Sequence, residues 1–282
     1  MFVTNIIAVL SVLLAPSSTA FNTAPTIISR KTTSLYSSLP PGPDNHNPMQ
    51  LWDISADKEK IVQGDSLKTW SYPSTQVDRV QVSMKTDGRP LNSKIDLWHG
   101  PDYTATTTTI YTEDGYLRPY NGVQATPKGM NTVGLYNTGS AELAYSTIVE
   151  ADPEKANLID YASNEIEMLA KKVLIQGGAI QSFPFSADVE SVAVYMKTDG
   201  RNLKCHIEIL QGPNNNKQTV EYYASDGYKR PLFTVIKTPG SGNVLRVTNQ
   251  NTVEYPFHAW VVPYEIQSNY SPYDAVEGGL VK

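Results

Sequence analysis

An internal duplication at a fixed offset of 112 residues limits the folds open to this chain, because a repeated sequence builds one structural unit twice. The block Met84–Arg89 (MKTDGR) recurs as Met196–Arg201, and ten of the eighteen positions from Met84 to Pro101 are identical in the second copy. A second block, DGYxRP from Asp114 to Pro119, recurs from Asp226 to Pro231. Upstream, Val62-Gln63-Gly64 corresponds to Ile175-Gln176-Gly177 at an offset of 113, which places a one-residue insertion between the copies.

Both copies have the alternation of β-strands with one buried face. Val80, Val82 and Met84 recur at every second position, as do their equivalents Val192, Val194 and Met196. An Asp-Gly pair follows each run, and we expect it to turn the chain into a hairpin with the next strand. Further strands are predicted at 95–98, 107–111, 133–137, 145–149, 205–209, 220–223, 232–236, 245–248 and 259–262.

Short strands separated by turns predict an all-β protein. We expect two tandem antiparallel domains, each a β-sandwich or jelly-roll-like sheet pair with its own core, related by pseudo-two-fold symmetry. The repeated turn residues in these domains are Asp87, Gly88, Arg89, Asp114 and Gly115 in the first copy, and Asp199, Gly200, Arg201, Asp226 and Gly227 in the second. Each of these aspartates precedes a glycine, where an aspartate usually bonds the backbone of its own turn.

One amphipathic helix is predicted between the copies. Asp152 is a suitable N-cap, Pro153 suits the first helical turn, and apolar residues from Leu158 to Ala170 recur at helical spacing. The predicted domains are therefore residues 51–151 for the first β repeat, 152–172 for the helix and 173–266 for the second repeat. Residues 267–282 form a C-terminal tail, either a frayed end or an arm that docks on a neighbouring subunit.

The first fifty residues have the composition of a targeting leader followed by a linker. The short apolar run Ile6–Ala15 and the small residues up to Ala20 predict a signal peptide over residues 1–20. Residues 21–38 are rich in Ser and Thr, contain no acid and begin with Phe21, so they are typical of a transit-like segment. Residues 39–50 are rich in proline and are predicted to be a linker. An ordinary secreted protein remains the alternative interpretation.

The residue inventory disfavours several classes of function. The formal net charge is −5, and no basic stripe with interleaved aromatic residues occurs, so a nucleic-acid partner is not expected. Cys205 is the sole cysteine, and the four histidines (His46, His99, His206 and His258) lack metal-ligand spacing. We also find no nucleophile elbow, phosphate-binding loop or HExxH motif. We therefore expect no catalytic residue, metal or cofactor, and no integral membrane segment in the mature protein.

The duplicated MKTDGR and DGYxRP blocks, together with the leader, resemble the pyrenoid shell proteins (PyShell) of diatoms. The resemblance extends from about Leu51 to the end of the chain. It implies a lattice-forming β-protein in the plastid stroma, at the periphery of the pyrenoid, that forms a thin shell around RuBisCO and supports CO2 concentration.

The implied partner is the chain itself, in homo-oligomeric sheets or tubes, and RuBisCO or other pyrenoid components are further candidate partners. Under this resemblance the candidate assembly contacts are Trp98, Arg118, Pro119, Arg230, Pro231, Tyr270, Pro272, Tyr273 and Leu280.

Two other classes of function remain open. A tandem β-sandwich is also a common carbohydrate- or ligand-binding module, in which exposed Tyr and Trp side chains stack on sugars. The third class is an enzyme on the same scaffold, which the fold alone neither supports nor excludes.

Overall fold

The computed structural model describes Trp52 and residues 56–266. This part of the chain contains one α-helix, a short 3-10 turn at Ala56–Lys58 and β-strands in two series of eight. The first series is β1 (Lys60–Val62), β2 (Ser66–Tyr72), β3 (Arg79–Lys85), β4 (Leu91–His99), β5 (Thr104–Thr112), β6 (Tyr120–Ala125), β7 (Asn131–Asn137) and β8 (Tyr145–Glu150). After α1 (Pro153–Leu169) come β9 (Val173–Ile175), β10 (Ile180–Pro184), β11 (Val189–Lys197), β12 (Leu203–Gln211), β13 (Asn216–Ala224), β14 (Leu232–Lys237), β15 (Asn243–Asn249) and β16 (Phe257–Ile266).

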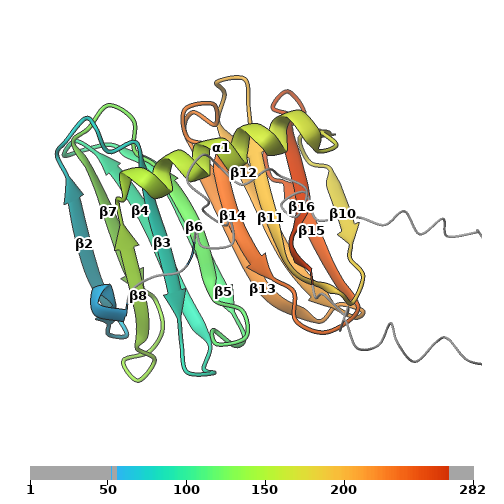
Figure 1. The fold of residues 1–282 in the computed structure, drawn as a ribbon, viewed down its shortest axis with the longest axis horizontal. Coiled ribbons are helices and arrows are strands. Elements are labelled where there is room, and N and C mark those ends of the chain that lie inside the picture. Colours follow the sequence, from blue (N-terminus) through green and yellow to red (C-terminus); the bar gives the residue numbers. More distant parts are fainter. Residues whose placement is uncertain (1–51, 53–55, 267–282) are drawn as a thin grey trace, which may run out of the picture. The chain divides into compact units, whose positions relative to one another are not determined.

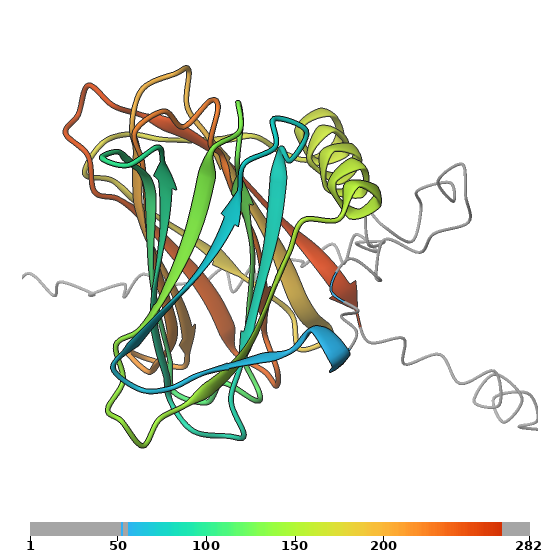
Figure 2. The same ribbon diagram turned by 90° about the vertical axis from the view of Figure 1, so that its left-hand side faces the viewer.

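The strands form two antiparallel sheets that face each other (Figures 1 and 2). Sheet A has the order β1-β8-β3-β6-β14-β11-β16-β9, and sheet B has the order β10-β15-β12-β13-β5-β4-β7-β2. Within each repeat the first, eighth, third and sixth strands face the second, seventh, fourth and fifth, which is a jelly-roll arrangement. The prediction of an all-β antiparallel sandwich with one helix is confirmed.

The two repeats join edge to edge in both sheets. In sheet B, β5 pairs with β13, and the register is centred on the pair Thr109–Glu221. In sheet A, β6 pairs with β14, centred on Gly122–Thr234. Each central pair joins positions 112 residues apart, so the register has the pseudo-two-fold symmetry expected of the repeats.

The core differs from the expectation of two separate cores. One cluster of buried hydrophobic residues runs through both repeats, because the joined sheets enclose a single continuous interior. Val80, Val82 and Met84 are fully buried within it, as are their counterparts Val192, Val194 and Met196. The alternation in the sequence therefore identified the buried face of β3 and β11 correctly.

The predicted Asp-Gly hairpins are wrong. Strand β3 pairs with β6 and β8 in sheet A, whereas β4 pairs with β5 and β7 in sheet B, so the turn at Gly88 carries the chain from one sheet to the other. Gly88 and Gly200 have φ values of 98° and 107°. A glycine with positive φ can form a tight corner between two sheets as well as a hairpin turn within one sheet. The Asp-Gly dipeptide therefore does not specify which strands pair after the turn.

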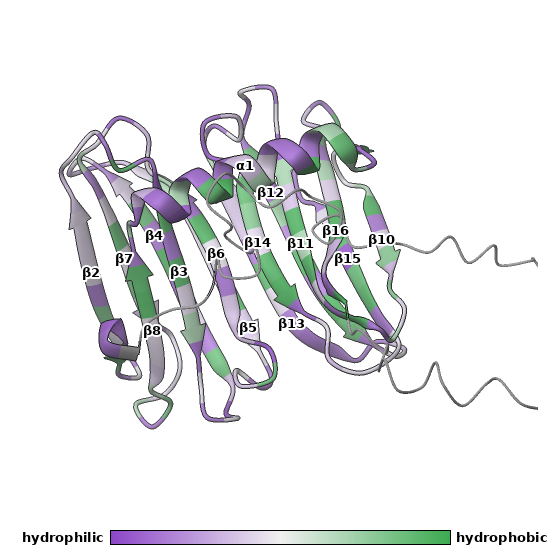
Figure 3. Cartoon of the chain, in the orientation of Figure 1, coloured by the Kyte–Doolittle hydropathy of each residue, from purple (hydrophilic) through white to green (hydrophobic). Residues whose placement is uncertain are grey.

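Helix α1 lies across the outer face of sheet A (Figures 1 and 2). The Asp152 carboxylate caps it by accepting hydrogen bonds from the backbone N–H groups of Glu154 (2.9 Å) and Lys155 (3.4 Å). Its buried face presents Ile159, Ala162 and Ile166 to a layer of large side chains that includes Tyr195, Phe233, Trp260 and Tyr264. Figure 3 shows long hydrophobic stretches along β11 and β14, two of the strands that carry this layer.

Candidate functional site

The two repeated sequence blocks meet in space at one corner of each repeat. In the first repeat the backbone N–H of Thr86 donates to the carbonyl of Gly115 (3.2 Å), and the N–H of Gly115 donates to the carbonyl of Arg89 (3.1 Å). The second repeat has the same pair of bonds, from Thr198 to Gly227 (3.3 Å) and from Gly227 to Arg201 (2.8 Å). The MKTDGR and DGYxRP blocks are therefore two halves of one corner structure.

The aspartates of these blocks act within their own turns. The Asp114 carboxylate accepts from the N–H groups of Tyr116 (2.9 Å) and Leu117 (3.0 Å), and Asp226 does the same in the second repeat. Asp87 pairs with Arg89 (2.8 Å), and Asp199 with Arg201 (3.6 Å).

The same arginines also hold the loop before the last strand of each repeat. Arg89 donates to the carbonyl of Glu142 (2.8 Å), and Arg201 donates to the carbonyl of Glu254 (2.6 Å). The repeated turn residues thus have a structural role in each repeat, because they bond the corner and the neighbouring loop.

The candidate assembly contacts Arg118 and Arg230 are buried, with 4% and 7% of their surface exposed. The Arg118 guanidinium reaches across the seam between the repeats and donates to the side-chain oxygen of Gln211 (3.1 Å). Burial lowers the pKa of Arg118, and Glu113 and Asp114 act against this effect. Both side chains are therefore largely buried within the chain.

Pro119 and Pro231 are half-buried and line two depressions on the outer face of sheet A. The depression at Pro231 lies between α1 and the sheet, and the ion pairs Arg79–Asp160 (3.1 Å) and Lys197–Glu167 (2.8 Å) connect the helix to the strands beside it.

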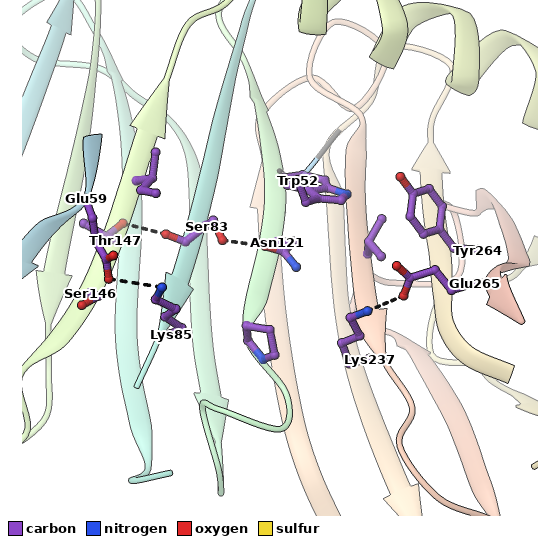
Figure 4. Close-up of a pocket in the computed structure, with 13 residues that line it drawn as sticks. Trp52, Glu59, Ser83, Lys85, Asn121, Ser146, Thr147, Lys237, Tyr264 and Glu265 are labelled. Carbon is purple, nitrogen blue, oxygen red and sulfur yellow. Dashed lines mark hydrogen bonds and ion pairs between the residues drawn. The ribbon is translucent and has the colours of Figure 1, made fainter. Parts of the chain in front are cut away.

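The depression at Pro119 is an open groove of about 370 Å³ (Figure 4). Trp52 lies over it, and an ion pair stands on either side, Lys85–Glu59 (3.4 Å) and Lys237–Glu265. Between these pairs a chain of hydrogen bonds runs from Thr147 to the Ser83 carbonyl (2.9 Å) and from the Ser83 hydroxyl to Asn121 (2.7 Å). Each cation is matched by an acid, so the groove offers no uncompensated charge to an ionic ligand.

The groove exists because the two repeats have diverged on this face. Tyr195, Phe233 and Trp260 form the floor under α1, and the residues at the corresponding positions of the first repeat are Ser83, Asn121 and Ile148. Smaller and more polar side chains leave no apolar layer for a helix to cover. The aromatic layer of the helix-covered cluster therefore comes mainly from the second repeat, with Val123 from the first, and the groove at Pro119 stays open.

The outer face of sheet B carries Trp98, a further candidate contact. Trp98 is half-buried, and its ring lies against Gly134, where a Cβ atom would come within 2.7 Å of the ring. Tyr111 and Tyr223 occupy equivalent positions on β5 and β13 and are exposed. Charged side chains on this face pair with each other, as in Lys94–Asp96 (2.8 Å) and Arg246–Glu208 (2.7 Å). The face is a polar surface with scattered aromatic rings.

Groups able to do chemistry are few. Burial raises the pKa of the Cys205 thiol to about 12, so the thiolate that a nucleophile requires is not formed. His206 lies beside Glu221 (3.1 Å) and Glu208 (3.6 Å), as part of the ion pairs on sheet B. Among residues 56–266 and Trp52, no three potential metal ligands cluster. In the same residues, no helix has the length and apolar character needed to cross a membrane.

The remaining predicted residues, Tyr270, Pro272, Tyr273 and Leu280, lie outside the described residues, as does the predicted leader. A set of exposed apolar residues on the outermost strands was not among the predicted contacts: Ile61, Leu67, Leu174 and Ile180. The signal was present, because these residues are apolar in both copies at the offset of 113.

Comparison with known proteins adds a family and a set of distant structures. The chain has 6% identity to an oxalate decarboxylase studied for its substrate-binding mode and reaction specificity, over 76% of this chain and 69% of that one, with a TM-score of 0.19. It has 8% identity to procruciferin, the 11S globulin of Brassica napus, over 72% of this chain and 76% of that one, with a TM-score of 0.20. At these scores neither likeness bears on function.

No curated protein matches the chain. The family model described as diatom pyrenoid shell protein, in contrast, matches residues 52–263, which is more than half of the chain and includes both repeats. The chain belongs to the diatom pyrenoid shell protein family.

Proposed function

We propose that this protein is a structural subunit that self-assembles into a sheet-like shell around the RuBisCO-containing pyrenoid and so supports CO2 concentration and fixation. Family membership supports a structural role in the pyrenoid. We further propose that residues 1–20 and 21–38 direct the chain through the secretory pathway into the plastid stroma, where copies of the chain itself are its main partners.

The observation that carries the proposal is the way the repeats join. Within the chain, strand pairing between β5 and β13 and between β6 and β14 already extends two jelly rolls into continuous sheets. The outermost strands β1, β2, β9 and β10 each have a single strand partner among the described residues. The two repeats are already joined through strand edges, and the joined pair still presents a strand edge at each end of each sheet. These edges have the geometry for further association.

Electron microscopy of the purified protein without residues 1–38 tests the proposal, at several salt concentrations and without any added partner. Sheets or tubes are the expected result. Persistent monomers at high protein concentration would contradict self-assembly and favour a ligand-binding module instead.

A carbohydrate-binding module is the second candidate function, because Tyr111, Tyr223 and Trp98 place aromatic rings on the outer face of sheet B. Binding of soluble glycans to the monomer, lost in the double variant Tyr111→Ala/Tyr223→Ala, is the result expected of that function. A glycan array with no signal would remove it.

A further inference from the structure

The two ends of the β-sandwich are equivalent to each other. At one end the last strands are β1 in sheet A and β2 in sheet B, and at the other end they are β9 and β10. These strands occupy the same places in the two repeats. Strand β2 pairs with β7 on one side, and β10 pairs with β15 on one side; the described residues place no strand on the outer side of either.

Each end carries the same pair of exposed aliphatic side chains. Ile61 on β1 and Leu67 on β2 are 58% and 51% exposed. Their counterparts at the offset of 113, Leu174 on β9 and Ile180 on β10, are 51% and 60% exposed. A single exposed aliphatic residue needs no explanation, but natural edge strands usually carry charges that prevent association. The edge strands do carry Lys60, Lys68 and Pro184, which are residue types of protected edges, but the aliphatic pair is retained at both ends beside them.

The faces on which these side chains lie are compatible with strand pairing. On β2, Trp70 and Tyr72 pack against the core, so Leu67 points to the outer face of sheet B. On β10, Phe183 packs against the core, so Ile180 points to the same outer face. If β10 of one copy pairs with β2 of another, Leu67 and Ile180 therefore become same-face neighbours across the junction. Ile61 and Leu174 have the same relationship on the outer face of sheet A, because Val62 and Ile175 are buried.

Strand direction permits copies to meet head to tail. Each sheet contains eight strands, and every neighbouring pair is antiparallel, so the first and last strands of a sheet run in opposite directions. A second copy displaced along the sheet without rotation consequently presents its β2 antiparallel to β10 of the first copy. Such a contact joins two different surfaces, does not close on itself and repeats indefinitely.

We propose that copies of this chain associate head to tail, with β10 and β9 of one copy pairing with β2 and β1 of the next, so that both sheets continue from copy to copy. This inference rests on the proposed self-assembly and specifies one of the contacts that a sheet requires. The partner is a second copy of the same chain.

Two blocked variants test the contact in the protein without residues 1–38. Leu67→Asp places a charge at the β2 end, and Ile180→Asp places one at the β10 end. Leu117→Asp is the matched control, because Leu117 is a leucine of similar exposure (49%) in the turn between β5 and β6. Sedimentation velocity should show that each blocked variant is unable to form rows alone, and that an equimolar mixture of the two forms dimers through the remaining pair of intact ends. The control should assemble as the parent does.

A cysteine pair gives an independent test that does not depend on a charged substitution. Mixing Leu67→Cys with Ile180→Cys under mild oxidation should give a disulfide-linked heterodimer, whereas Leu117→Cys mixed with Ile180→Cys should not. The native Cys205 is buried and does not compete.

The outcomes separate this contact from self-assembly itself. Dimers of Leu67→Asp alone would show that like ends meet, and would overturn the head-to-tail arrangement. Parent-like sheets from both blocked variants, without a disulfide in the cysteine mixture, would overturn the contact and leave self-assembly standing. A parent protein that forms neither rows nor sheets would contradict the proposed function.

Discussion

Asn249→Ala is expected to destabilise the protein by about 3 kcal/mol, because the Asn249 side chain is fully buried and makes three hydrogen bonds. Its amide nitrogen donates to the carbonyls of Ile175 (3.0 Å) and Tyr255 (2.9 Å), and its amide oxygen accepts from the N–H of Asn251 (3.0 Å). Each such bond contributes about 1 kcal/mol net, and leaving a buried partner unsatisfied costs about 1–3 kcal/mol. Three hydrogen bonds at about 1 kcal/mol each give the expected loss of about 3 kcal/mol.

The duplication supplies a matched second site for this prediction. Asn137 binds the carbonyls of Val62 (3.2 Å) and Leu143 (2.7 Å) in the same way, so Asn137→Ala should show a similar loss. The two asparagines lie near opposite ends of the sheets, and the double variant should therefore be additive within about 0.5 kcal/mol.

Urea unfolding followed by tryptophan fluorescence and by far-UV circular dichroism measures both losses as shifts of the midpoint at constant slope. Gln250→Ala, at the exposed neighbouring position, is the control and should change stability by less than about 0.5 kcal/mol. A loss of less than about 1 kcal/mol in both asparagine variants would show that the buried amides do not hold the outermost strands.

Three further outcomes are expected. Gly177→Ala should destabilise the protein by about 3 kcal/mol and lower its melting temperature in calorimetry. The added Cβ would lie 1.7 Å from the carbonyl oxygen of Thr252, and a backbone atom cannot move aside as a flexible side chain can. An unchanged melting temperature would refute this prediction. The hydrogen bond from Arg246 lowers the pKa of Glu208 below its ordinary 4.5 and outweighs the opposing effect of burial. The stability that this pair contributes is therefore present above pH 4.5 and lost as the pH falls through the lowered pKa, and Glu208→Gln should reduce the acid-induced loss in urea titrations. Cys205 should resist thiol reagents at mildly alkaline pH until the protein is unfolded, and rapid labelling of the native protein would contradict its burial.

The sequence predicted the parts of the fold that depend on local pattern. Alternation located the buried face of β3 and β11, and the cap at Asp152 located the start of α1. Strand β6 was missed because every residue from Tyr120 to Ala125 is buried, since its outer face is also covered, and no alternation remains in YNGVQA. The Asp-Gly turn at Gly88 was identified, but its consequence was wrong, because a turn fixes local dihedral angles and leaves the pairing of strands to long-range contacts.

The candidate assembly contacts show the same difference between what a local sequence pattern predicts and what depends on long-range contacts. Arg118 was chosen because it is repeated, yet repetition also marks residues that hold the seam, and burial at 4% exposure cannot be derived from one sequence. The exposed residues Ile61 and Leu174 were overlooked because an aliphatic residue in a strand normally indicates core. The difference between Ser83 and Tyr195 is visible in the aligned repeats, and in the structure it distinguishes the two halves of the outer face of sheet A.

The position of α1 on sheet A alone gives the protein two unlike sides. Among the described residues, one side carries a helix and an ion-paired groove, and the other is a sheet surface with tyrosines and paired charges. Copies that join by displacement without rotation all keep the same side uppermost. In the proposed shell, a layer built in that way has two different faces, so the difference between its inner and outer side is already contained in a single chain.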